Sequence, residues 1–217
     1  MVKTLSALLV LGSLALAQSA AATDYCVNAS CGGTPEPTLE DALAAAGSAS
    51  DADRVFVGSG TYTAPSTLGY VSVAPDSPVE IIGAGAGQTI LTAPTAATGV
   101  LALLGSSANG VHDLTVRFPA QAAAQAVGLE TSGTATRIAV SEDPTQGQSR
   151  KGVILESGGT LQDSTVDVGA VQYTSGVVFS TGGGALRNST VSASTAVESD
   201  YGGVIERSRL SASYLNS

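Results

Sequence analysis

The sequence predicts an all-β fold, a right-handed parallel β-helix (a solenoid) with an N-terminal capping helix. The first observation is a six-residue phrase in the second half of the chain, an apolar residue, four mostly polar or small residues, and a second apolar residue. The phrase begins at Val111, Ala135, Leu161, Leu186 and Ile205, at intervals of 24, 26, 25 and 19 residues. A repeat of this length is too short to bury its own apolar side, so it must stack on its neighbours.

The second observation is a further apolar run before each of the later phrases. These runs are Val127–Leu129, Gly152–Leu155, Gly176–Phe179 and Ala196–Val197. Their shortness and their Val, Ile and Leu content favour strands. Glycines that suit sharp corners follow them, at Gly133, Gly158–Gly159, Gly182–Gly184 and Gly202–Gly203. Two strands with their corners make one rung of a parallel β-helix. Leucine-rich repeats share the period, but their Leu and Asn pattern is missing.

Stacking the phrases predicts which residues form the interior columns. The column of final apolar residues contains Val116, Val140, Val166, Val191 and Leu210, and a second column contains Ser164, Ser189 and Ser208. Buried parallel strands need such a continuous aliphatic filling.

The capping helix is the third observation. Thr38 followed by Asp41 forms a capping box, and apolar residues at helical spacing follow it as far as Ala46. A helix from about Thr38 to Ala46 would precede the first strand, Arg54–Val57, and cover the open end of the coil. We expect a right-handed coil from about residue 55, since right-handed crossovers are strongly preferred.

The N-terminal half also carries short segments in a characteristic order. They are Asp24–Val27, Gly33–Thr34, Pro37–Leu43, Asp53–Val57, Gly60–Tyr62, Val79–Gly87 and Thr89–Leu91. This order resembles the opening of secreted right-handed β-helix proteins of the pectin-lyase-like superfamily. The resemblance implies the fold and not one activity, because the superfamily holds lyases, hydrolases, esterases and proteins with no known reaction.

Residues 1–22 resemble a signal peptide. Lys3 supplies the positive start, Leu5–Ala17 the apolar centre, and Ala15–Ala17 or Ala20–Ala22 a small-residue cleavage site. A membrane anchor would need a longer apolar stretch, about 20 residues. We therefore expect a secreted or cell-surface protein without a transmembrane segment after cleavage. It would have an N-terminal segment at 23–54 and a β-helix at 55–217 that is truncated at its C-terminus.

Composition excludes some partners. The chain has 18 Asp and Glu against nine Lys and Arg, a net charge of −9, which disfavours nucleic acid and anionic membranes. Both cysteines, Cys26 and Cys31, lie near the mature N-terminus. In an oxidising compartment they are expected to form a local disulfide; the alternative, a redox pair or metal site, lacks the usual Cys-x-x-Cys spacing.

Chemistry is harder to place. The motifs that we associate with polygalacturonases, pectate lyases and pectinesterases are not found. The single histidine, His112, has no evident acidic partner in the sequence beyond Asp113, so an incidental surface position is favoured.

Two groups of charged residues are candidates. The loop between Val140 and Gly152 concentrates charge, and solenoid loops often bind ligands; Glu142 and Asp143 are binding candidates there. The catalytic candidates are Asp163, Asp167, Arg150 and Lys151.

Asp163 belongs to a ladder column, beside Asp167, of residues at the same position in successive phrases: Asp113, Arg137, Asp163, Asn188 and Arg207. Adjacent rungs place column members about 5 Å apart, so a simple charge ladder is the favoured interpretation over β-elimination or Ca²⁺-assisted sugar chemistry. No cofactor is expected, although the carboxylates could bind Ca²⁺ weakly.

Two functional hypotheses follow. The first is an exported non-catalytic β-helix module with a structural or binding role at the cell surface or outside the cell, with polysaccharide or cell-envelope components as partners. The second is a carbohydrate-active enzyme, a polysaccharide lyase or glycoside hydrolase, whose catalytic residues are partly missing from this chain. The absence of Trp weighs against strong sugar stacking.

Overall fold

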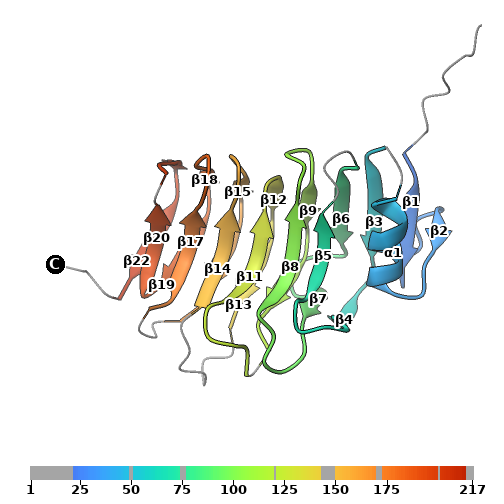
Figure 1. The fold of residues 1–217 in the computed structure, drawn as a ribbon, viewed down its shortest axis with the longest axis horizontal. Helices are drawn as coiled ribbons and strands as arrows, with labels where there is room; N and C mark the ends of the chain where they lie inside the picture. Colours follow the sequence, from blue (N-terminus) through green and yellow to red (C-terminus); the bar gives the residue numbers. More distant parts are fainter. Residues whose placement is uncertain are drawn as a thin grey trace, which may run out of the picture.

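A computed structural model describes residues 22–48, 51–73, 77–119, 121–142, 150–169, 173–199 and 201–213. The chain winds as a right-handed parallel β-helix, in which the strands of three sheets follow one another in each coil (Figure 1). All strand pairs among the described residues are parallel, which confirms the predicted fold class. The signal-peptide prediction falls on residues 1–21, outside the described residues, and on Ala22.

Sheet A has the strand order β2 (Thr34–Pro35), β1 (Asp24–Val27), β3 (Asp53–Val57), β6 (Val79–Gly83), β9 (Gly110–His112), β12 (Thr134–Thr136), β15 (Thr160–Gln162), β18 (Ala185–Arg187) and β21 (Val204–Glu206). Sheet B has the order β22 (Arg209–Ala212), β19 (Thr190–Ala193), β16 (Thr165–Asp167), β13 (Ala139–Ser141), β10 (Thr115–Arg117), β7 (Thr89–Thr92) and β4 (Gly60–Thr63). Sheet C has the order β20 (Thr195–Ser199), β17 (Ser175–Phe179), β14 (Arg150–Leu155), β11 (Ala126–Thr131), β8 (Gly99–Leu104) and β5 (Tyr70–Val73).

The coil has three strands, where the sequence predicted two. The six-residue phrase is divided by a bend at its third residue, so its first part pairs in sheet A and its last part in sheet B. The bend residues have positive φ, between 46° and 59°: Asp113, Arg137, Asp163, Asn188 and Arg207. The residue in this left-handed conformation turns the strand from one sheet to the next, which an apolar pattern alone does not reveal.

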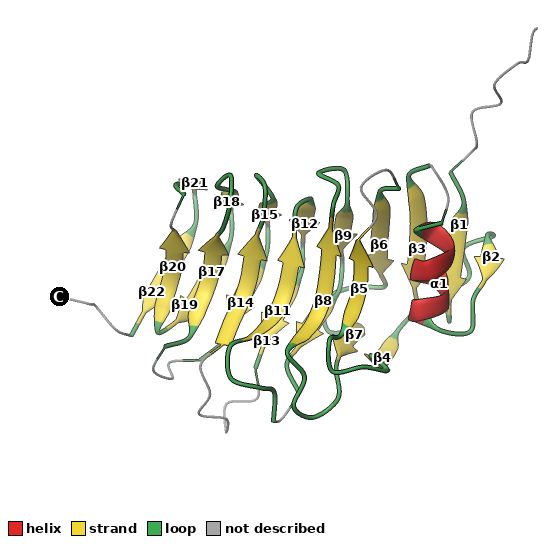
Figure 2. Cartoon of the chain, viewed as in Figure 1, coloured by secondary structure: helices red, strands yellow, loops and turns green. Residues whose placement is uncertain are grey.

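The helix α1 (Leu39–Ala46) confirms the predicted cap. Thr38 is its N-cap, and its Oγ1 accepts a hydrogen bond from the N–H of Asp41 at 3.1 Å. The buried side of the helix packs against the first coil, near β1, β3 and β5 (Figure 2). Within the described residues, no helix is long and apolar enough to cross a bilayer.

The N-terminal segment is more than a cap. Strand β1, which precedes α1, pairs with β3 and adds Val27 to the core, so sheet A begins before the predicted start near residue 55. Cys26 in β1 forms a disulfide with Cys31, as predicted.

The interior columns are those that the sequence predicted, with one exception. Val116, Val140, Val166 and Val191 are at most 1% exposed. Leu210, expected in the same column, is 42% exposed. It lies in the last described rung, so no described residue packs on its outer side.

Candidate binding face on sheet C

Arg150, the first residue of β14, is buried, whereas the neighbouring candidate Lys151 is partly exposed. Arg150 Nη1 lies 2.5 Å from Glu142 Oε1, and its Cζ lies 5.3 Å from the centre of the Phe118 ring. The side chains of Arg150 and Glu142 are 0% and 3% exposed. A buried pair of this kind fixes the end of β13 to the start of β14, and neither group faces an external polymer.

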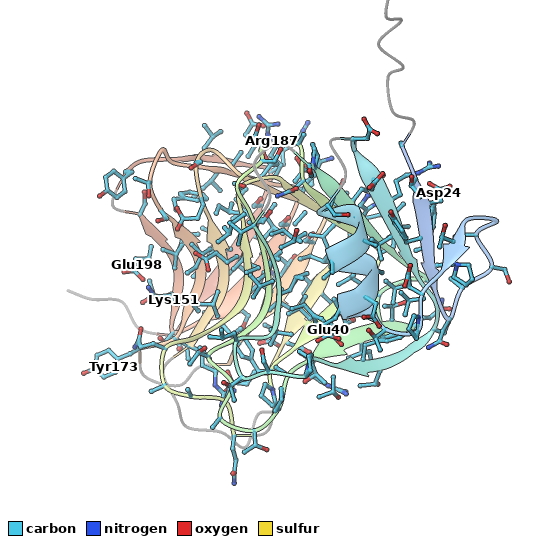
Figure 3. All side chains as sticks on the ribbon, turned by 45° about the vertical axis from the view of Figure 1, so that its right-hand side comes forward. Asp24, Glu40, Lys151, Tyr173, Arg187 and Glu198 are labelled. Atoms are coloured by element: carbon cyan, nitrogen blue, oxygen red, sulfur yellow. A yellow bond between two sulfur atoms is a disulfide. The ribbon has the colours of Figure 1, made fainter. Side chains whose placement is uncertain are left out.

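Lys151, the next residue, points outward because side chains alternate along a strand. It lies on the outer face of sheet C, which we call the sheet C face. Figure 3 shows Lys151 and Glu198 on the same side of the coil, with Tyr173 projecting from the loop below them. Tyr173 and Tyr201 are 71% and 64% exposed. Among the described residues near β17 and β20, these two are the exposed aromatic side chains.

The outward residues of sheet C form two columns in register. One column contains Val71, Ala102, Glu130, Ile154, Val178 and Glu198. The other contains Gly99, Val127, Lys151, Ser175 and Thr195. Strands lie about 4.8 Å apart, so the five steps from β5 to β20 span about 24 Å along the coil axis.

The end of the sheet C face near β5 is apolar. Leu68, Val71 and Val73 are 66%, 47% and 62% exposed. Two of them, Leu68 and Val71, line a hollow of about 260 Å³, together with Thr98, Gly99, Leu101, Ala102, Leu104, Val127 and Glu130. The carboxylate of Glu130 thus marks the border between the apolar and polar ends of the face.

The polar end is held by hydrogen bonds. Ser175 Oγ donates to Glu198 Oε2 at 2.8 Å, and Thr181 Oγ1 donates to Glu156 Oε2 at 3.2 Å. Burial raises the pKa of Glu130, the nearby charge of Glu156 raises it further, and Lys151 opposes the shift. A carboxyl group with a raised pKa holds its proton closer to neutral pH than a free one does.

The remaining sequence candidates lie elsewhere. Asp163 is exposed in the bend between β15 and β16, where Gln162 Nε2 donates to its Oδ2 at 2.9 Å. Asp167 is exposed on β16, and its backbone carbonyl accepts a hydrogen bond from Glu142 N–H at 3.2 Å. The structure therefore does not bring Asp163, Asp167 and Lys151 into one site. Asp143 lies outside the described residues.

The predicted charge ladder is formed in part. Arg137 Nε and Nη2 donate to the two carboxylate oxygens of Asp113 at 2.7 and 2.6 Å. This pairing lowers the pKa of Asp113 and raises the pKa of Arg137, to which the charge of Asp163 also contributes. No group of three His, Cys, Asp or Glu side chains that could hold a metal ion is found in the described part of the chain. Weak Ca²⁺ binding stays a prediction.

His112 has a partner that the sequence analysis missed. Its Nε2 lies 2.9 Å from Oε1 of Glu80, 32 residues earlier in the chain. The signal was present in the stacking pattern: Ile81 occupies the core column of Val111, so Glu80 and His112 lie on the same outer face of sheet A.

Comparison with known proteins gives support for the fold. No protein-family model and no curated protein sequence matches this chain. Among solved structures, the A-module of the mannuronan C-5 epimerase AlgE4 from Azotobacter vinelandii is similar, with a TM-score of 0.50 and 16% sequence identity. The match covers 78% of this chain but 53% of the module, so the chain corresponds to about half of the module's length. At this identity, the similarity supports the parallel β-helix architecture and not a shared activity.

Proposed function

We propose that this protein is an exported β-helix module that binds a polysaccharide along the sheet C face without changing it chemically. The observation that carries the proposal is the division of this face. An apolar hollow at Val71 continues into hydroxyl, ammonium and carboxylate groups at Lys151, Ser175 and Glu198. Sugar units present both apolar C–H surfaces and hydroxyl groups, and binding sites for them combine apolar area with a few placed polar groups.

The shape of the face favours an extended ligand. Its longer outward column, from Val71 to Glu198, runs along the coil for about 24 Å, whereas the 260 Å³ hollow alone holds little more than a small molecule. Tyr173 and Tyr201 supply exposed rings at the margins of the face. The similar solved structure is a module of a mannuronan C-5 epimerase, which supports an acidic polysaccharide as the first ligand class to test.

A second candidate function, a polysaccharide lyase or glycoside hydrolase, is favoured by one observation. Glu130 combines a raised pKa with the nearby ammonium of Lys151. These are parts that proton transfer requires. We prefer the binding role because the two other carboxylates nearby, Glu198 on the sheet C face and Glu156 just after β14, are already hydrogen-bonded to hydroxyl groups of the protein.

The test is binding of the mature protein to pectate, alginate and a neutral glucan by affinity electrophoresis, at more than one salt concentration. We expect Lys151→Ala to weaken retardation by an amount on the order of tenfold in Kd. The matched control is Arg187→Ala, which removes an exposed cation on sheet A. Equal retardation of the two variants, or no retardation of the parent by any polymer, contradicts the proposal.

The same preparations decide between binding and catalysis. Each polymer is incubated with the protein, with and without Ca²⁺, while unsaturated product is followed by ultraviolet absorbance and reducing ends are measured in parallel. We expect no turnover. Turnover that Glu130→Gln or Lys151→Ala abolishes would establish the enzyme instead, and turnover lost in Asp163→Ala would move the active site to that residue.

A further inference from the structure

A second hollow lies on a different face of the coil, the outer face of sheet A. It has a volume of about 410 Å³ and we call it the Gly110 hollow. Its lining is Glu80, Ser107, Ala108, Asn109, Gly110, His112, Thr134, Thr136 and Arg137. All but Ala108 and Gly110 carry polar side chains, which distinguishes this hollow from the apolar one on sheet C.

The hollow exists because Gly110 has no side chain. In the register of sheet A, Gly110 stands between Glu80 on β6 and Thr134 on β12, in an outward-facing column. A Cβ placed on Gly110 would lie 3.2 Å from Cγ of Glu80 and would occupy the space between its neighbours. Gly110 has no positive φ in this structure, so its conformation does not require glycine. The missing side chain of Gly110 instead leaves the hollow open between Glu80 and Thr134.

The charged groups around the hollow are arranged in two pairs. On one side His112 Nε2 lies 2.9 Å from Glu80 Oε1, and on the other Arg137 binds Asp113 through two hydrogen bonds. Glu80 and Arg137 line the hollow with opposite charges, so an ion of either sign meets one attractive and one repulsive group. This balance favours an uncharged ligand over either kind of ion.

The pairs leave hydrogen-bonding capacity directed at a ligand. His112 Nε2 lies 2.9 Å from Glu80 Oε1 and its Nδ1 lies 3.8 Å from Asp113 Oδ2, so each ring nitrogen faces a carboxylate oxygen. Arg137 has donors beyond the two that it gives to Asp113, and its side chain is 55% exposed. The hydroxyl groups of Thr134 and Thr136 can donate or accept. Hydrogen-bond donors and acceptors therefore both border this one small space.

We propose that the Gly110 hollow binds one neutral sugar unit through its hydroxyl groups. Each sugar hydroxyl is both a donor and an acceptor, so neighbouring hydroxyls can match Glu80 and His112 on one side and Arg137 on the other. The inference does not depend on the role of the sheet C face. Where both faces bind, the module holds two glycan segments on different sides of one rigid coil.

The single histidine makes this hollow directly observable. His112 is the only imidazole in the chain, so its ring ¹⁵N resonances report on the hollow without assignment of the rest of the protein. The mature protein is titrated at one fixed pH with the methyl glycosides of glucose, galactose and mannose, and in parallel with galacturonate and glucosamine. We expect at least one neutral glycoside to shift the His112 resonances in a saturable way.

Variants locate the effect. Gly110→Val fills the hollow and should weaken the binding by at least about tenfold, and Thr134→Tyr fills it from an exposed position if the first variant fails to fold. Thr160→Val, next in the same column but outside the hollow, should bind as the parent does. The proposal is overturned by the absence of a shift with every neutral glycoside, by a shift with the charged sugars alone, or by binding that survives in both filled variants.

Discussion

Ser164 and Ser189 lie on successive coils, and Ser189 Oγ accepts a hydrogen bond from the backbone N–H of Ser164 at 3.1 Å. The same oxygen donates to the carbonyl of Arg187 in its own coil at 2.7 Å. Ser164 repeats the arrangement one coil earlier, where its Oγ accepts from Ile138 N–H and donates to Gln162 carbonyl. The serine column is therefore a ladder that satisfies backbone groups where the strand bends between sheets A and B.

Ser189→Ala should destabilise the protein by about 1–3 kcal/mol, because the buried N–H of Ser164 and the carbonyl of Arg187 both lose a partner. Urea unfolding followed by circular dichroism measures the free energy of unfolding. Ser211→Ala, at an exposed position of β22, is the control and should change it by less than about 0.5 kcal/mol. Equal effects of the two substitutions would show that the ladder does not contribute to stability.

The ladder also shows which parts of the fold can be predicted from sequence. Apolar columns are visible because Val166 and Val191 recur in phase, and the serines recur with them. The bend at Asp163 and Asn188 is not visible, since a left-handed conformation at a non-glycine residue has no apolar signature. The sequence therefore predicted two strands per coil, and the third sheet was missed.

The candidate site was less predictable than the fold. Arg150 and Lys151 are neighbours in the chain, yet alternation along β14 buries the first against Glu142 and leaves the second on the sheet C face. The partner of His112 was missed because Glu80 belongs to the previous coil. Composition and local spacing do not contain such inter-coil contacts, which depend on the register of the strands.

Val166→Asp should prevent the adjacent coils from folding. Val166 is fully buried, and its Cγ1 would be only 2.6 Å from a Cβ built on Gly152 of sheet C, so no room remains for water around a carboxylate. The expected cost is at least about 4 kcal/mol. Limited proteolysis and far-ultraviolet circular dichroism test it, with Thr165→Asp at the neighbouring exposed position as the control. A Val166→Asp protein as protease-resistant as the parent would show that the core is assigned wrongly.

The ion pair between Asp113 and Arg137 should make stability depend on acid. Arg137 lowers the pKa of Asp113 in the folded protein. The pair's contribution is therefore present above the unfolded pKa, about 3.9, and is lost as the pH falls through the lower folded value. Asp113→Asn, which suits the positive φ of 59° at this position, should remove that dependence. Thermal unfolding at pH values from about 6 down to about 2 measures this dependence of stability on pH. In the control variant Asp167→Asn, the unfolding midpoint should fall with pH in parallel with that of the parent. If the midpoint of Asp113→Asn also falls in parallel with that of the parent, the prediction is wrong.

The contribution of Glu130 to stability should depend on pH in the opposite direction to that of Asp113. Burial, followed by the charge of Glu156, raises the pKa of its carboxyl group above the ordinary value, so the folded state is favoured by the protonated form. That contribution is fully present below the unfolded pKa of about 4.3 and is lost as the pH rises through the higher folded value.

At pH 7 the protein carries a partly buried charge on Glu130 that Lys151 only partly offsets. Glu130→Gln should therefore raise the free energy of unfolding near pH 7 by an amount on the order of 0.5 kcal/mol, and the gain should vanish near pH 4. Urea unfolding at the two pH values measures both quantities, and Glu36→Gln near the N-terminus serves as the control. A gain that is equal at both pH values would mean that ionisation of Glu130 has no part in it, and it would remove the raised pKa from the case for proton transfer on the sheet C face.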